Sequence, residues 1–179
     1  MNALEAIFSR RTIRRYNGEQ ITDKELDTLL SAAYAAPAGH ARYEELHLLV
    51  ITNKEFIARW EARFGECNGI ENAHPFYGAP TVVLVSSVMN PAPMDNVKYS
   101  DAAGIVENMA LAATEIGVGA CHIWGAVRAL NASPDLLAEL NLPQGRVPCC
   151  AIALGHTDEV YTRREIKKNR IATDFFKGE

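Results

Sequence analysis

Cysteine is scarce in this sequence, and positive charge does not exceed negative charge. Four of 179 residues are cysteine, too few for the disulfide framework of a small secreted domain. The 18 basic and 22 acidic residues give a net charge of −4, so no overall positive field would hold the chain on nucleic acid or on an anionic membrane. These features favour a reducing, cytoplasmic setting and disfavour a nucleic-acid-binding protein.

Long apolar runs are also missing. The longest uncharged stretch, residues 72–94, is long enough to cross a bilayer, but it contains four prolines and His74. Near the amino terminus, Glu5 comes early and Arg10 and Arg11 follow the short apolar run, which reverses the order found in an export signal. We therefore expect neither a membrane span nor an export signal.

The short motifs of several enzyme classes are absent. No C-x-x-C or H-x-x-x-H spacing occurs, so the neighbouring Cys121 and His122 do not indicate a metal site. The patterns G-x-S-x-G, G-x-G-x-x-G and G-x-x-x-x-G-K-[ST] are missing as well, which disfavours a serine hydrolase, a Rossmann enzyme and a P-loop protein. We expect no metal and no catalytic triad.

What is present is typical of one folded domain over residues 1–179, because 48% of the residues are hydrophobic and 22% are charged. A capping box of Thr22 and Glu25 predicts the start of a helix that ends before Pro37. Further helices are predicted after Asn53, over residues 101–116 up to Gly117, and after Ser133. Strands are predicted from apolar runs at residues 46–52, 81–87, 120–124 and 149–154.

Two basic clusters lie near opposite ends of the chain. Residues 9–16 read S-R-R-T-I-R-R-Y, and residues 167–170 read K-K-N-R. A solvated basic loop is the simpler interpretation of each cluster. The functional interpretation is a phosphate site, because arginine offers a fixed fork of donors that suits a phosphate monoester. Convergence of the two clusters on one anion would explain both.

A third candidate is G-V-G-A-C-H-I-W-G at residues 117–125, which predicts a strand that places Trp124 and Gly125 at its end. Trp124 is either an ordinary core residue or part of a ligand site, and the residues alone leave both open. Gly125 slightly favours the ligand, because a glycine lets the backbone approach a flat molecule closely.

Four segments carry a further signal. They are, in order, S-R-R-T-I-R-R-Y, A-A-Y-A-A-P-A-G-H, D-A-A-G-I-V-E-N-M-A-L-A-A-T-E-I-G-V-G-A and A-L-G-H. In order and spacing the sequence resembles the nitroreductase family of FMN-dependent oxidoreductases. The resemblance implies an α+β fold with a mixed central sheet flanked by helices. It also implies an intertwined homodimer with two FMN sites at the subunit interface.

The resemblance implies cofactor-binding residues position by position. In the family, an amino-terminal motif binds the FMN phosphate and the ribityl-side pyrimidine edge, and it matches Arg10, Arg11, Thr12 and Arg14. A late K-x-R at the phosphate matches Lys168 and Arg170. The loop that covers the partner's isoalloxazine matches Pro37, Ala38, Gly39, His40 and Ala41. The strand end that faces the ring, with backbone N–H groups near N5, matches Ile123, Trp124 and Gly125.

The covering loop departs from the family pattern. The family usually reads A-P-S-x-x-N-x-Q-P-W, whereas this chain reads A-P-A-G-H-A-R-Y-E-E. Ala41 stands at the asparagine position, so either His40 or Arg42 substitutes for the missing amide or the ring is held less tightly with an altered potential.

The implied activity is oxidation of NADH or NADPH and reduction of a flat acceptor, such as a nitroaromatic or a quinone, in a ping-pong cycle. The flavin carries the chemistry, so no catalytic side chain is expected. A flavin-binding sensor or storage protein without turnover is the alternative. A third interpretation is a nucleic-acid or partner-binding domain that uses the arginines.

Overall fold

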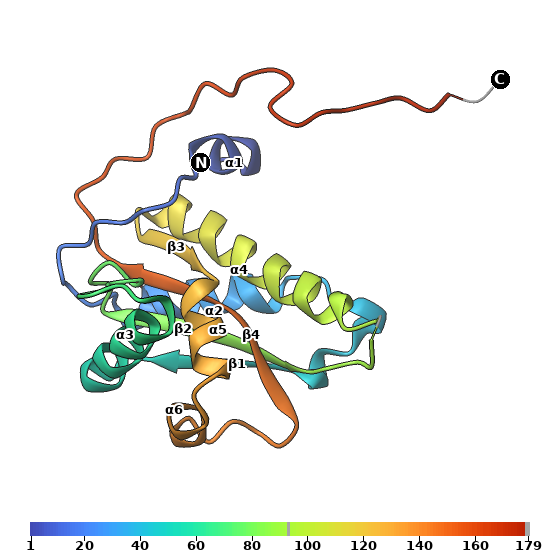
Figure 1. Cartoon of the computed structure of the whole chain (residues 1–179). Helices are drawn as coiled ribbons and strands as arrows, with labels where there is room; N and C mark the ends of the chain where they lie inside the picture. Colours follow the sequence, from blue (N-terminus) through green and yellow to red (C-terminus); the bar gives the residue numbers. More distant parts are fainter. Residues whose placement is uncertain (93, 178–179) are drawn as a thin grey trace.

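The computed structural model describes residues 1–92 and 94–177 and has an α+β architecture (Figure 1). This confirms the predicted fold class. The helices are α1 (Ala3–Ser9), α2 (Asp23–Tyr34), α3 (Lys54–Asn68), α4 (Asn96–Ile116), α5 (Gly125–Asn131) and α6 (Pro134–Glu139), with short 3-10 turns at Gly39–Ala41 and Tyr43–Glu45. The strands are β1 (Leu46–Ile51), β2 (Thr81–Val88), β3 (Gly119–Ile123) and β4 (Arg146–Gly155).

The four strands form one sheet in the order β1-β2-β4-β3, and all three neighbouring pairs are antiparallel. The resemblance predicted a mixed sheet, and the described strands do not form one. The reason is the position of β4. Helix α4 carries the chain back so that β2 and β3 run in the same direction, but β4 lies between them and pairs antiparallel with both.

Two cores lie on opposite faces of the sheet, because successive residues of a strand point to opposite sides. On β2, Val83 and Val85 pack with α2 and α4, while Val82 and Leu84 pack with α3 and α5. Trp60 of α3 is fully buried in the second core, and its indole N–H donates to the Ala126 carbonyl at 2.6 Å.

Local signals explain some of the helix boundaries. Thr22 and Glu25 form the predicted capping box, Asn53 caps α3, and Gly117 ends α4 in a left-handed conformation. Ser133 was predicted to cap α6, but its hydroxyl donates to the Ala129 carbonyl instead. Helix α4 begins at Asn96, five residues before the predicted start.

Two short helices were not predicted. Helix α1 starts with a capping box of Asn2 and Glu5, and α5 follows Trp124 directly. The carboxyl-terminal segment after β4 crosses α1, where the Arg164 amide donates to the Phe8 carbonyl at 3.0 Å, and then runs away from the body (Figure 1). Among the described residues, no helix has both the length and the apolar character needed to span a membrane.

Candidate anion-binding and cofactor site

The arginine segment lies along the edge of the sheet beside β3. Ile13, in the middle of the segment, is fully buried, and its N–H donates to the Ala120 carbonyl at 2.9 Å. Ile13 anchors the segment, with Arg10 and Arg11 half-buried before it and Arg14 and Arg15 exposed after it. The cluster is therefore positioned by the fold and is not a free loop.

Arg10 follows α1 and forms an ion pair with α4. Its Nε lies 3.1 Å from Glu107 Oε1, and the other oxygen of that carboxylate lies 3.2 Å from Nε2 of His122 on β3. The hydrogen bond with His122 and the charge of Arg10 hold the pKa of Glu107 below its usual value. Glu107 thus engages Arg10 through Nε, so that the terminal nitrogens of Arg10 can meet another anion.

Arg11 connects the amino-terminal segment to the carboxyl-terminal tail. One terminal nitrogen donates to the carbonyl of Thr162 at 3.0 Å and to its hydroxyl at 2.9 Å. Its Nε is buried and has no hydrogen-bond partner among the described residues. A buried donor of this kind is costly unless something accepts from it.

The two ends of the chain bring their positive charges together around Arg164. Burial lowers the pKa of Arg164, and the charges of Arg10, Arg170 and Arg11 lower it further. We call Arg10, Arg11, Arg164 and Arg170 the arginine cluster. Its members repel one another, and Glu107 is the acidic group that acts on both Arg10 and Arg164. The arrangement therefore favours binding of an anion with more than one negative charge.

Sequence reasoning missed Arg164 and Glu107. The basic pair at residues 163–164 was a usable signal for the arginine, but nothing local indicates that Glu107 reaches Arg10. Lys168 lies in an exposed turn two residues before Arg170, and Thr12 is also exposed. Neither has a side-chain partner in the described part of the chain that would decide its role.

Arg14 points elsewhere. Its guanidinium lies 5.6 Å from the centroid of the Tyr77 ring, and the hydrogen bond with Tyr77 raises the pKa of Arg14. Arg14 thus lies beside the Tyr77 ring.

An aromatic pair, one ring exposed and one half-buried, lies at the end of β3. Ile123 is buried, whereas Trp124 is 49% exposed, and its ring lies 6.4 Å from the Tyr99 ring of α4. Trp124 is thus not a core residue. A Cβ on Gly125 would lie 3.0 Å from Phe64 Cε2, so packing against Phe64 is one reason for a glycine there, without a ligand.

The loop at residues 37–41 lies beside the first turns of α4, where Val97 and Asp101 are its neighbours (Figure 1). His40 and Ala41 have positive φ angles of 57° and 55°, and the Gly39 N–H donates to Asp101 at 2.8 Å. Pro37, His40 and Ala41 are exposed. Arg42, one of the two proposed substitutes for the missing amide, pairs with Glu45 at 3.1 Å, which leaves His40 as the side chain free to reach a ligand.

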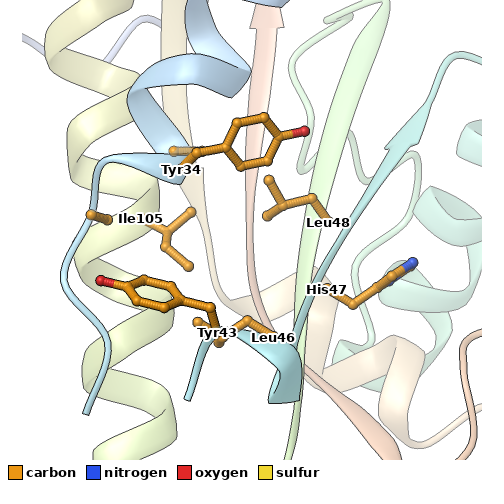
Figure 2. A pocket seen from close by; sticks show the side chains of 8 residues that line it. Tyr34, Tyr43, Leu46, His47, Leu48 and Ile105 are labelled. Atoms are coloured by element: carbon orange, nitrogen blue, oxygen red, sulfur yellow. The ribbon is translucent and has the colours of Figure 1, made fainter. Parts of the chain in front are cut away.

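Next to this loop lies an apolar cavity of about 400 Å³ between α2, α4 and β1 (Figure 2). Exposed rings of Tyr34 and Tyr43 and the side chains of Leu46 and Leu48 line it, while the His47 imidazole points away (Figure 2). None of the predicted cofactor residues lines this cavity. Within residues 1–92 and 94–177, no group of three or more His, Cys, Asp or Glu is placed to hold a metal ion.

The chain is thus an α+β protein with arginines gathered beside the β3 edge of an antiparallel sheet and with Trp124 exposed at the end of β3. The sequence model of the nitroreductase family matches residues 7–156. The chain therefore belongs to the nitroreductase family.

Individual relatives agree with this assignment. A protein from Archaeoglobus fulgidus, whose name gives NADH dehydrogenase/NAD(P)H nitroreductase as a provisional activity, is 28% identical over 154 residues, covering 86% of this chain and 84% of that protein. The FMN reductase (NADPH) of Bacillus subtilis is 26% identical over 167 residues, covering 87% and 66%. The crystal structure of a nitroreductase with bound FMN from Bacteroides fragilis superposes with a TM-score of 0.76 at 28% identity, covering 98% and 100%.

Proposed function

We propose that this protein is an FMN-dependent oxidoreductase that uses NADH or NADPH to reduce a flat electrophilic acceptor. The observation that carries the proposal is the arginine cluster, in which the charges of Arg10, Arg11 and Arg170 act on half-buried Arg164 and the buried Nε of Arg11 has no partner among the described residues. A terminal phosphomonoester such as that of FMN carries close to two negative charges and several acceptor oxygens, which match such a cluster. The Bacteroides fragilis relative with bound FMN supports the same cofactor.

In this proposal, different residues bind different parts of FMN. The arginine cluster holds the phosphate, with Arg10 oriented through its Nε by Glu107. We assign Arg14, whose guanidinium lies beside the Tyr77 ring, to the pyrimidine edge of the flavin. The backbone at residues 123–125 then faces the ring. When bound, FMN supplies two-electron chemistry between the nicotinamide and the acceptor, so the protein needs only to bind and orient.

A flat acceptor fits the aromatic pair at the end of β3. Trp124 and Tyr99 present exposed and half-buried rings to the same region, and aromatic rings stack with flat electron-poor molecules. Donor and acceptor use one place in turn, so the kinetics are ping-pong. Nitroaromatics and quinones are the classes of acceptor that we propose.

The proposal includes a homodimer in which residues 37–41 of one subunit cover the flavin of the other. Support comes from the exposed Tyr34 and Tyr43, 69% and 53% accessible, beside this loop, and from β1 being an edge strand of the sheet. Light scattering at micromolar concentration should give twice the mass of 19.7 kDa. A monomer that retains one FMN per chain would show that each site is complete within a single subunit.

The activity is tested by reconstituting the protein with FMN and adding NADPH or NADH under anaerobic conditions. We expect the yellow absorbance to bleach and to return when a quinone is added. In the steady state, double-reciprocal plots of rate against nucleotide concentration at several acceptor concentrations should be parallel lines. A yellow protein that neither nucleotide bleaches would be the sensor or storage protein of the alternative interpretation. A colourless protein that retains DNA at 0.15 M salt would favour the third.

A further inference from the structure

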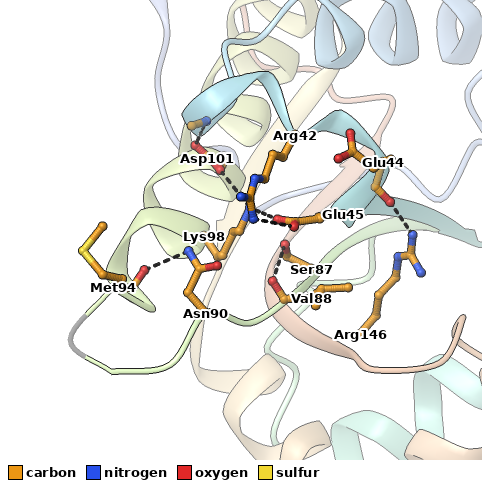
Figure 3. A network of polar contacts seen from close by, with 11 residues as sticks. Arg42, Glu44, Glu45, Ser87, Val88, Asn90, Met94, Lys98, Asp101 and Arg146 are labelled. Carbon is orange, nitrogen blue, oxygen red and sulfur yellow. Dashed lines mark hydrogen bonds and ion pairs between the residues drawn. The ribbon is translucent and has the colours of Figure 1, made fainter.

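A buried lysine lies beneath the loop at residues 37–41. Lys98, in the first turn of α4, is only 1% exposed. An ammonium group cannot be buried at tolerable cost unless carboxylates face it. Its Nζ contacts Glu45 and lies 4.0 Å from Asp101 Oδ2 (Figure 3). Lys98 is not a member of the arginine cluster, and a hydrophobic core gives no reason to bury a charge. We therefore look for the reason in its two carboxylate partners.

Asp101 connects the lysine to the loop. One oxygen, Oδ1, accepts the Gly39 N–H at 2.8 Å, while Oδ2 faces Lys98 and has no hydrogen-bond partner among the described residues. Asp101 itself is only 7% exposed. The backbone of the loop is therefore tied to α4 through one carboxylate whose position depends on Lys98.

Glu45 ties the other end of the same loop. Its carboxylate contacts Lys98 and also pairs with Arg42 at 3.1 Å (Figure 3). Lys98 thus joins two carboxylates, one bonded to the start of the turn and one bonded to its end. The charges of Arg42, Lys98, Glu45 and Asp101 balance, so the network requires no external ion.

The turn held in this way is strained. His40 and Ala41 adopt left-handed backbone conformations, which are uncommon for residues other than glycine and persist where surrounding contacts impose them. Gly39 lies so close to α4 that a Cβ would come within 2.6 Å of Val97 Cγ1. Residues 39–41 are not buried, and conformations of this kind cluster at functional sites.

We propose that Asp101, supported by Lys98, is the positioning residue that presents the strained turn at residues 39–41 to the flavin ring. The inference rests on the proposed function, in which this loop covers the ring. Ala41 has no side chain to bond the ring, so recognition falls to His40 and to the peptide groups of the turn. Their orientation is set by the bond from Gly39 to Asp101. The network thereby orients the groups that bond the flavin ring in place of the asparagine side chain that the family has at position 41.

Riboflavin separates this role from phosphate binding, because it has the same ring and no phosphate. In Asp101→Ala the Gly39 N–H loses its acceptor, so we expect the affinities for riboflavin and for FMN to fall by the same factor, about tenfold. Asp101→Asn keeps an oxygen at the same place and should restore most of both affinities. Arg10→Ala should weaken FMN alone. Exposed Asp27 of α2 provides the matched control, since Asp27→Ala should leave both affinities unchanged.

Each outcome decides the matter. A folded Asp101→Ala protein with unchanged riboflavin affinity, or with only FMN weakened, overturns the positioning role while the proposed function stands. If the parent binds neither flavin, the proposed function fails and the inference with it. If Asp101→Ala does not fold, Arg42→Ala takes its place, because Arg42 is 54% exposed and lies at the outer end of the network. A loss of about threefold in riboflavin affinity supports the inference, and no loss overturns it.

Discussion

Replacing Arg10 with alanine should damage FMN binding and spare turnover. The substitution removes one of the four charges of the arginine cluster and leaves Glu107 with His122 as its remaining close partner. The phosphate then faces an uncompensated carboxylate where a guanidinium stood. In the proposed site other segments hold the flavin ring, so the geometry of the redox step should persist.

The size of the loss follows from the surroundings of Arg10. Removing one partner of a desolvated charge pair costs about 2 to 5 kcal/mol of binding free energy. The side chain of Arg10 is 25% exposed, and Arg11, Arg164 and Arg170 remain, so the lower end of the range applies. A loss of about 2 kcal/mol corresponds to an affinity about 30-fold weaker.

The assay is a fluorescence titration of apoprotein with FMN, followed by turnover at saturating FMN. Arg15→Ala is the matched control, because Arg15 lies in the same segment, is exposed and has no role in the cluster. We expect Arg10→Ala to bind about 30-fold less tightly and to keep its turnover number within a few-fold of the parent. Equal affinities for Arg10→Ala, Arg15→Ala and the parent would show that the arginines are a solvated patch.

Three further predictions concern stability and thiol reactivity. Trp60→Phe leaves the Ala126 carbonyl without its donor, and urea denaturation should show a loss of about 1 to 3 kcal/mol; an unchanged midpoint would contradict this. The fold lowers the pKa of Glu107, so its charged form stabilises the protein above its usual pKa of 4.5 and that stability is lost as pH falls below it. In urea denaturation, Glu107→Gln should thus have a lower free energy of unfolding than the parent at pH 7, and the difference should vanish in acid. A difference that does not change with pH would refute this role of Glu107. A thiol reagent should label only exposed Cys67 quickly in the native protein, and rapid labelling of more than one thiol would contradict the burial. The slow thiols are Cys121, Cys149 and Cys150, and burial raises the pKa of the last two to about 11 and about 12.

Sequence reasoning succeeded where the signal is local. The capping box at Thr22 and the glycine stop at Gly117 depend on neighbouring residues, and both are present in the fold. The start of α4 failed because its first turn has no side-chain cap and contains Lys98, whose burial depends on Glu45, distant in sequence. The sequence does not predict the strand order for the same reason, since only the path of the whole chain places β4 between β2 and β3.

In the candidate site, too, the residues with a local sequence signal were predicted and those brought together only by the fold were not. The arginines at residues 10–15 are visible in the sequence, because a dense basic cluster needs an explanation in an acidic protein. Arg164 and Glu107 are not visible in this way, since a single charge in a tail or on a helix has many uses. Their roles emerge only when the tail crosses α1 and brings its charges to those of Arg10.

The flavin content of the purified protein tests the central claim most directly. The protein is saturated with a mixture of FMN, FAD and riboflavin, freed of unbound flavin, heated to release what is bound, and the supernatant is separated by chromatography. The account predicts FMN at about one molecule per chain, because the arginine cluster suits a terminal phosphomonoester. Recovery of FAD, or of no flavin at all, would contradict it.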